Sequence, residues 1–127
     1  MLSYDKIPVV SECEILKVAL EKMEKLNLGI VCIIDNQKKL LGIITDGDIR
    51  RKLLKSQKPF SAFYVNDAIN YAITSPITIT PNSLIHDALT IMEKKQIWDI
   101  PVVNEEGTLV GLLHLHHALK AILSAEH

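Results

Sequence analysis

One stretch of the sequence, GIITDGDIRR from Gly42 to Arg51, gathers residue types that can do chemistry. Thr45 and Asp48 stand three positions apart after an apolar run, which is the spacing of a helix capping box. A carboxylate held at such a helix start can also accept hydrogen bonds from the two vicinal hydroxyls of a ribose. The same pair therefore predicts a capped helix and a candidate site for a ribose-bearing ligand.

Charged neighbours extend this candidate site. Asp46 adds favourable negative charge to the first turn of the expected helix. Arg50 and Arg51 follow, and an arginine near a helix start can hold a ligand phosphate by a bidentate contact. The sequence leaves open which arginine faces the junction, because that depends on the rotation of the helix. A solvated helix face is the alternative for both arginines.

An internal repeat defines the elements that must position these residues. EILKVALEKMEKLN, from Glu14, matches SLIHDALTIMEKKQ, from Ser83, and the shift of 69 positions holds across the unit without a gap. Agreement over such a length indicates two copies of one structural unit. We predict a first unit over residues 1–58, a connector with a short helix over 59–74, and a second unit over 75–127.

Each copy has the hydrophobic pattern of a β-α-β-β-α unit. A short extended segment comes first, IPVV in one copy and PITIT in the other, and an amphipathic helix follows. Two strands joined by a polar hairpin turn come next, and a closing helix covers about residues 46–54 or 115–123. We expect a mixed α+β fold in which the two units pack through their sheets with pseudo-twofold symmetry, because neither alone buries a full core.

The second copy departs from the first at its own strand-to-helix junction, GLLHLHHAL. His114 stands in place of Thr45 and His117 in place of Asp48, and His116 lies between the two histidines. We expect no zinc site, because this turn spreads the three side chains apart and no Cys, Asp or Glu adjoins them. Donors facing a ligand cleft and solvated surface histidines are the two alternatives.

Two further residues complete the candidate ligand set. Trp98, the single tryptophan, precedes a buried strand of the second copy, and it either lies at the rim of the core or forms a wall of a ligand cleft. Gly42 lies in the apolar run that leads to the first junction. The ligand-binding candidates are therefore Gly42, Thr45, Asp46, Asp48, Arg50, Arg51, Trp98, His114 and His117.

The composition argues against several classes of function. Hydrophobic residues make up 48% of the chain and the net charge is -1, which gives no reason to expect nucleic acid or an anionic membrane as partner. Cys13 and Cys32 lack metal-ligand spacing, and the longest apolar run is far shorter than the roughly 20 residues that cross a bilayer. The start of the chain lacks a signal-peptide pattern, so we expect a cytoplasmic protein. G-x-G-x-x-G, P-loop and G-x-S-x-G motifs are absent, so we expect no catalytic residues.

The repeated β-α-β-β-α pattern with G-h-h-T-x-x-D after the last strand resembles a pair of CBS domains, a Bateman module, over nearly the whole chain. The resemblance implies that Thr45 and Asp48 hold the ribose of an adenosine ligand, a pair that the second copy lacks. GIITDGDIRR, VNDAI and GLLHLHHAL together resemble the C-terminal CBS pair of arabinose 5-phosphate isomerases of Kdo and lipopolysaccharide biosynthesis. His117 departs from that pattern, which carries an Asp there. In those proteins a preceding sugar isomerase (SIS) domain carries the catalysis.

The resemblance implies a non-catalytic, ligand-sensing regulatory module. The expected ligand is a nucleotide or sugar nucleotide, namely AMP, ATP or a CMP-sugar such as CMP-Kdo, and its binding would modulate a sugar-phosphate isomerase. A homodimer through the CBS pairs and a SIS domain in cis are the expected partners. The alternatives are an assembly module that dimerises through the apolar residues Ala118, Leu119 and Ile122, the CBS pair of a sugar nucleotidyltransferase, and an enzyme in its own right.

Overall fold

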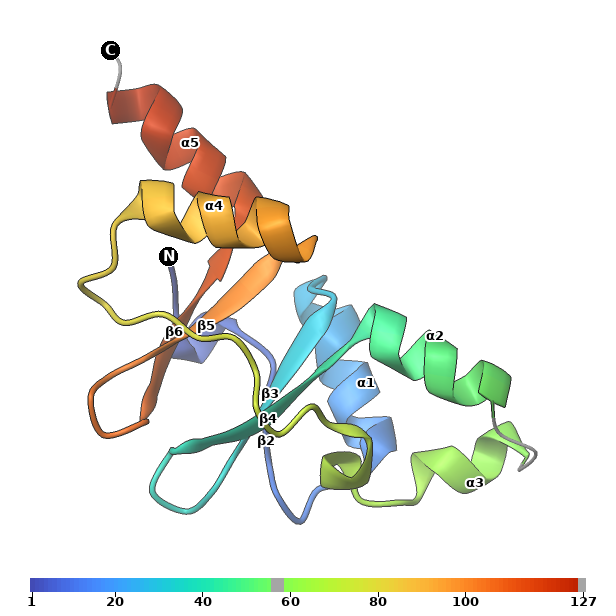
Figure 1. Cartoon of the computed structure of the whole chain (residues 1–127). Helices are drawn as coiled ribbons and strands as arrows, with labels where there is room; N and C mark the ends of the chain where they lie inside the picture. Colours follow the sequence, from blue (N-terminus) through green and yellow to red (C-terminus); the bar gives the residue numbers. More distant parts are fainter. Residues whose placement is uncertain (56–58, 126–127) are drawn as a thin grey trace. The chain divides into compact units, whose positions relative to one another are not determined.

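The computed structural model describes residues 1–55 and 59–125, and it has the predicted mixture of helices and two small sheets (Figure 1). Residue contacts divide the chain into two units. The first unit is Ile7–Pro76, and the second joins Met1–Lys6 to the residues from Ile77 onward. The predicted end of the first unit, at residue 58, lies outside the described residues. No described helix, in 1–55 or 59–125, is long and apolar enough to cross a bilayer.

The first unit is built on a sheet of order β2-β3-β4. β2 (Val9–Ser11) runs parallel to β3 (Ile30–Ile34), and β4 (Leu40–Thr45) runs antiparallel to β3. α1 (Leu16–Leu26) makes the crossover between the two parallel strands. Four of the five residues of β3 are buried, which explains its continuous run of apolar, mostly β-branched residues.

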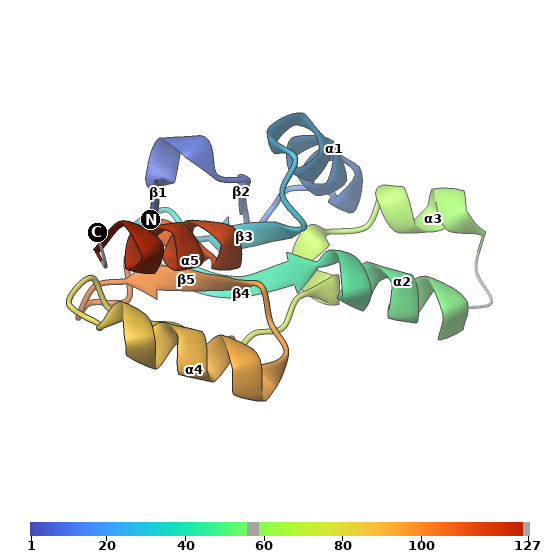
Figure 2. The ribbon, with the colours of Figure 1, turned by 90° about the horizontal axis from the view of Figure 1, so that it is seen from above.

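β4 runs directly into α2 (Asp46–Lys55), with no loop between strand and helix (Figure 2). The connector then forms α3 (Phe60–Tyr64) and the 3-10 helix η2 (Ala68–Tyr71), which both contact α1. η2 lies within the segment 59–74 that was predicted as a connector with a short helix. α3 buries Phe63 in the core of the first unit, whereas most of the other described connector residues are exposed or half-buried.

The second unit repeats the arrangement on a sheet of order β1-β6-β5. α4 (Ile85–Lys95) precedes the antiparallel hairpin of β5 (Asp99–Val103) and β6 (Leu109–His114). β6 continues into α5 (Leu115–Ala125), and α4 and α5 contact each other beside the hairpin (Figure 1). The closing helices therefore begin at equivalent positions of the two copies, directly after the last strand.

The last strand of each unit gains a neighbour that is distant in sequence. β1 (Leu2–Ser3), followed by the 3-10 helix η1 (Tyr4–Lys6), pairs antiparallel with β6. In the first unit, Ile73 pairs with Ile43 of β4 through hydrogen bonds of 2.8 and 3.0 Å. Residues 1–6 therefore join the second unit, whereas the sequence prediction assigned them to the first. A two-residue strand carries no periodic signal from which this pairing could be predicted.

The extended segment predicted in PITIT is reduced to one bridge. Ile79 pairs with Val102 of β5, and its N–H donates to the carbonyl of Pro101 (3.1 Å). Pro76 and Pro81 bound the segment, and proline has no N–H group to donate to a sheet. Only the middle of the segment therefore pairs with the sheet.

Candidate functional site

Thr45 and Asp48 form the capping box that their spacing predicts. The Thr45 hydroxyl donates to Asp48 Oδ2 (2.8 Å), and the Asp48 N–H donates to Thr45 Oγ1 (3.3 Å). The Thr45 N–H donates to the same carboxylate oxygen (3.3 Å). These contacts satisfy backbone donors that the start of a helix would otherwise leave unpaired. They also fix the Asp48 carboxylate at the junction of β4 and α2.

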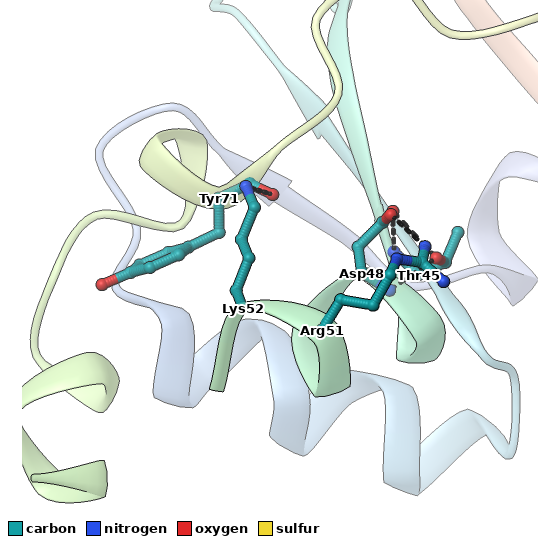
Figure 3. A network of polar contacts seen from close by, with 5 residues as sticks. All are labelled: Thr45, Asp48, Arg51, Lys52 and Tyr71. Atoms are coloured by element: carbon teal, nitrogen blue, oxygen red, sulfur yellow. Dashed lines mark hydrogen bonds and ion pairs between the residues drawn. The ribbon is translucent and has the colours of Figure 1, made fainter. Parts of the chain in front are cut away.

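Arg51 closes the network from the next helical turn (Figure 3). Its Nη2 donates to Asp48 Oδ1 (2.7 Å), so this arginine faces the junction. Arg50 and Arg51 are both exposed to solvent. Partial burial alone would raise the pKa of Asp48, but the hydrogen bonds from Thr45 and Arg51 and the Arg51 charge outweigh it. The pKa of Asp48 therefore lies below its ordinary value, and the carboxylate is ionised at neutral pH.

Gly42 and Asp46, the other candidates in this stretch, lie apart from the network. Gly42 is buried in β4, where an added Cβ would lie 2.8 Å from the carbonyl oxygen of Ile73. The Asp46 N–H donates to the carbonyl of Gly29 (3.1 Å). Its side chain lines a shallow depression of about 240 Å³ at the C-terminal end of α1. The structure therefore joins three of the candidates from this stretch, Thr45, Asp48 and Arg51.

Lys52, which the sequence reasoning missed, ties α2 to the connector. Its Nζ donates to the Tyr71 carbonyl (2.7 Å) and lies 5.6 Å from the centre of the Tyr71 ring. Figure 3 shows Lys52 turned toward Tyr71 and Arg51 turned toward Asp48. Two adjacent residues of α2 therefore make two different contacts. Arg51 binds Asp48 at the junction, and Lys52 binds Tyr71 of the connector. Lys52 and Tyr71 are 19 positions apart, so no local motif signals their contact.

The second junction has a different network. His114 Nδ1 lies 2.7 Å from Oδ1 of Asp99, which is the residue directly opposite it on β5. The sequence reasoning did not include Asp99 among the candidates. The ring centres of His114 and His117 are 5.9 Å apart, and those of His116 and His117 are 6.0 Å apart. Slight desolvation and the positive charges of the neighbouring histidines lower the pKa of His117. Across residues 1–55 and 59–125, no three His, Cys, Asp or Glu side chains are placed to hold a metal ion.

Two expectations about apolar side chains change with the structure. The Trp98 side chain is 68% exposed, so it does not lie buried at the rim of the core. Its role as a wall of a ligand site stays a prediction. Ala118 is fully buried and Leu119 is 47% exposed, so the apolar surface predicted on α5 does not include Ala118.

The capping role of Thr45 gives a first prediction. Thr45→Ala is expected to lower the free energy of unfolding by about 0.5–2 kcal/mol, because the helix loses its side-chain cap. Thr90→Ala is the matched control, since Thr90 is exposed within α4 and its hydroxyl donates to the His86 carbonyl of the same helix (3.0 Å). Its effect is expected to stay within about 0.5 kcal/mol. Urea unfolding followed by circular dichroism measures both variants, and equal losses would contradict the capping role.

Residues 5–55 and 66–124 each match the family model described as CBS domain. The arabinose 5-phosphate isomerase GutQ of Escherichia coli K12 is 32% identical over 117 residues, which cover 92% of this chain and 35% of GutQ. An uncharacterized protein of Rickettsia prowazekii is 31% identical over 119 residues, which cover 94% of this chain and 35% of that protein. The chain spans about a third of the length of these relatives.

Solved structures of the family share the fold. CBSX2 in complex with AMP superposes with a TM-score of 0.86 at 23% identity, covering 100% of this chain and 95% of that one. A CBS domain-containing protein of unknown function from Bacillus anthracis gives a TM-score of 0.84 at 21% identity, covering 100% and 91%. At these identities the likeness establishes the fold.

Proposed function

The chain belongs to the CBS domain family as a tandem pair, and we propose that its first strand-to-helix junction binds a nucleotide or sugar nucleotide. Thr45 and Asp48 would hold the ribose, and Arg51 would hold a phosphate. The observation that carries this proposal is the Asp48 carboxylate, an ionised acceptor fixed by Thr45 at the start of α2. A fixed acceptor loses little side-chain entropy when the vicinal hydroxyls bind to it.

Two relatives support the choice of ligand class. CBSX2 was solved with AMP bound, and GutQ is an arabinose 5-phosphate isomerase. AMP and ATP are therefore the first ligands to test. A CMP-sugar such as CMP-Kdo is the second choice, because a later product of a sugar-phosphate pathway is a suitable feedback signal for such an isomerase.

The proposed consequence of binding is regulation of a sugar-phosphate isomerase, carried by a SIS domain in the same chain or by a partner chain. Such regulation requires the ligand to bind two states of the module with different affinity. The CBS pair itself would be non-catalytic and would form a homodimer. Its junctions would bind and report a ligand without transforming it.

Mutation of Asp48 tests the site. The ligands to test are AMP, ATP, CMP and CMP-Kdo. Asp48→Ala is expected to weaken the binding of any of them that binds the unmodified chain by about tenfold to a hundredfold, because a hydrogen bond to a charged group is lost. Isothermal titration calorimetry on the full chain measures the change. The free energy of unfolding is recorded in parallel, so that each titration uses folded protein.

Asp35→Ala is the matched control for this experiment. The Asp35 carboxylate accepts the N–H groups of Gln37 (2.8 Å) and Lys39 (3.0 Å) in the hairpin turn of the same unit. Its loss removes a negative charge and structural hydrogen bonds without changing the junction, so unchanged affinity is expected. Equal weakening by both substitutions, or no heat from any of the four ligands, would reject the proposed site.

An assembly module is the second candidate, because leucines are exposed on two closing helices. Leu119 and Leu123 on α5 are 47% and 60% exposed, and Leu54 on α2 is 80% exposed. Such residues are suited to contact a second copy of the chain. Light scattering distinguishes the two functions, since a pure assembly module would form the same oligomer with and without nucleotide and would release no heat with any ligand.

A further inference from the structure

The Asp48 carboxylate is already engaged on both oxygens. Oδ2 accepts two hydrogen bonds from Thr45, and Oδ1 accepts one from Arg51 at 2.7 Å. Each carboxylate oxygen has about two lone pairs, so Oδ2 is filled and Oδ1 has one acceptor position left. A ribose offers two vicinal hydroxyls, and each needs an acceptor if both are to bind this carboxylate. The second hydroxyl therefore competes with the Arg51 guanidinium.

Arg51 is folded back over the first turn of α2. An added Cβ on Gly47 would lie 3.1 Å from Nη1 and 3.4 Å from Nη2, so the guanidinium occupies the space beside this glycine. The Arg51 side chain is 60% exposed, whereas the Asp48 side chain is only 12% exposed. An ion pair with one such exposed partner is weak. A ligand phosphate, which binds a guanidinium through two parallel hydrogen bonds, can therefore draw Arg51 away from Asp48.

We propose that Arg51 makes this junction selective for phosphorylated ribosides over free nucleosides. In the structure its guanidinium donates to Oδ1 of Asp48 and so competes with a ribose hydroxyl for this oxygen. A ligand that carries a phosphate attracts the guanidinium and frees Oδ1 for the second hydroxyl. A nucleoside has no group that can replace Asp48 as the partner of Arg51, so it must break the ion pair without compensation. This inference rests on the proposed ribose site at Thr45 and Asp48.

Arg51→Ala tests the selectivity with AMP and adenosine as the two probes. In the unmodified chain, AMP is expected to bind more tightly than adenosine. The substitution is expected to weaken AMP binding by about tenfold, because the charged phosphate contact is lost. It is also expected to tighten adenosine binding by about two- to fivefold, because the competing ion pair is gone. Calorimetry on the full chain measures both changes.

Lys55→Ala is the control for net charge, because it removes a positive charge from the last turn of the same helix. It is expected to leave the ratio of the two affinities unchanged. The selectivity is overturned if Arg51→Ala weakens AMP and adenosine by the same factor, if adenosine binding does not tighten, or if Lys55→Ala has the same effect. Binding that Asp48→Ala leaves intact, or no binding of either probe to any variant, overturns the ribose site itself and the selectivity with it.

Discussion

Leu16→Ala is expected to lower the free energy of unfolding by about 2–5 kcal/mol, the largest effect of any substitution considered for this chain. Leu16 is 1% exposed and belongs to the core cluster to which β2, β3, β4 and the connector contribute. Its N–H donates to the carbonyl of Asn66 (2.8 Å), which ties the start of α1 to the connector. Because this hydrogen bond holds the backbone at Leu16 in place, the cavity left by the side chain cannot easily collapse.

Leu54→Ala is the matched control for this core prediction. Leu54 lies on α2 and is 80% exposed, so the same chemical change removes almost no buried surface. Its effect is expected to stay within about 0.5 kcal/mol. Urea unfolding of both variants provides the comparison. A loss for Leu16→Ala no larger than that for Leu54→Ala would mean that the connector does not pack on α1 as the structure has it.

The internal repeat predicted the elements whose hydrophobic residues recur at a regular spacing. It missed the elements that lack such a pattern. Helices α1 and α4 and the two hairpins follow from hydrophobic patterns that recur at a shift of 69 positions. The helix α3 and the pairing of β1 with β6 depend on contacts that are distant in sequence. The position equivalent to Leu16, Ile85, is only half-buried, although the repeat makes the two residues look alike. Packing by the connector accounts for the difference, because α3 and η2 contact α1.

The same distinction holds at the candidate site. Thr45 and Asp48 are three residues apart, so a local motif was sufficient to predict their contact. The sequence reasoning left the choice between Arg50 and Arg51 open, although Arg51 lies three residues after Asp48 on the same helix, a spacing that brings two side chains together. The contact of His114 with Asp99 required the register of a hairpin, because the two residues are 15 positions apart. Contacts within one helical turn can therefore be predicted from the sequence, whereas contacts between elements depend on the fold.

Gly42→Ala is expected to lower the free energy of unfolding by about 1–3 kcal/mol, because it adds a methyl group where there is no room. The new Cβ would lie 2.8 Å from the carbonyl oxygen of Ile73 and 3.1 Å from Cβ of Ala72. Both contacts involve the connector segment that hydrogen-bonds to Ile43, so the backbone of this segment must move. Urea unfolding followed by circular dichroism measures the loss.

Gly47→Ala provides the comparison, because the same methyl group meets a different neighbour. At this position the Cβ would contact the end of the Arg51 side chain at 3.1 Å, and a flexible, exposed side chain can shift. Alanine also favours the helix over glycine by up to about 1 kcal/mol, so the free energy of unfolding is expected to stay constant or rise. A loss of stability for Gly42→Ala but not for Gly47→Ala would identify Gly42 as the residue that lets the connector approach β4. If Gly47→Ala lowers the free energy of unfolding as much as Gly42→Ala does, α2 tolerates no added methyl group at this position. If Gly42→Ala leaves the free energy of unfolding unchanged, the connector does not lie against β4.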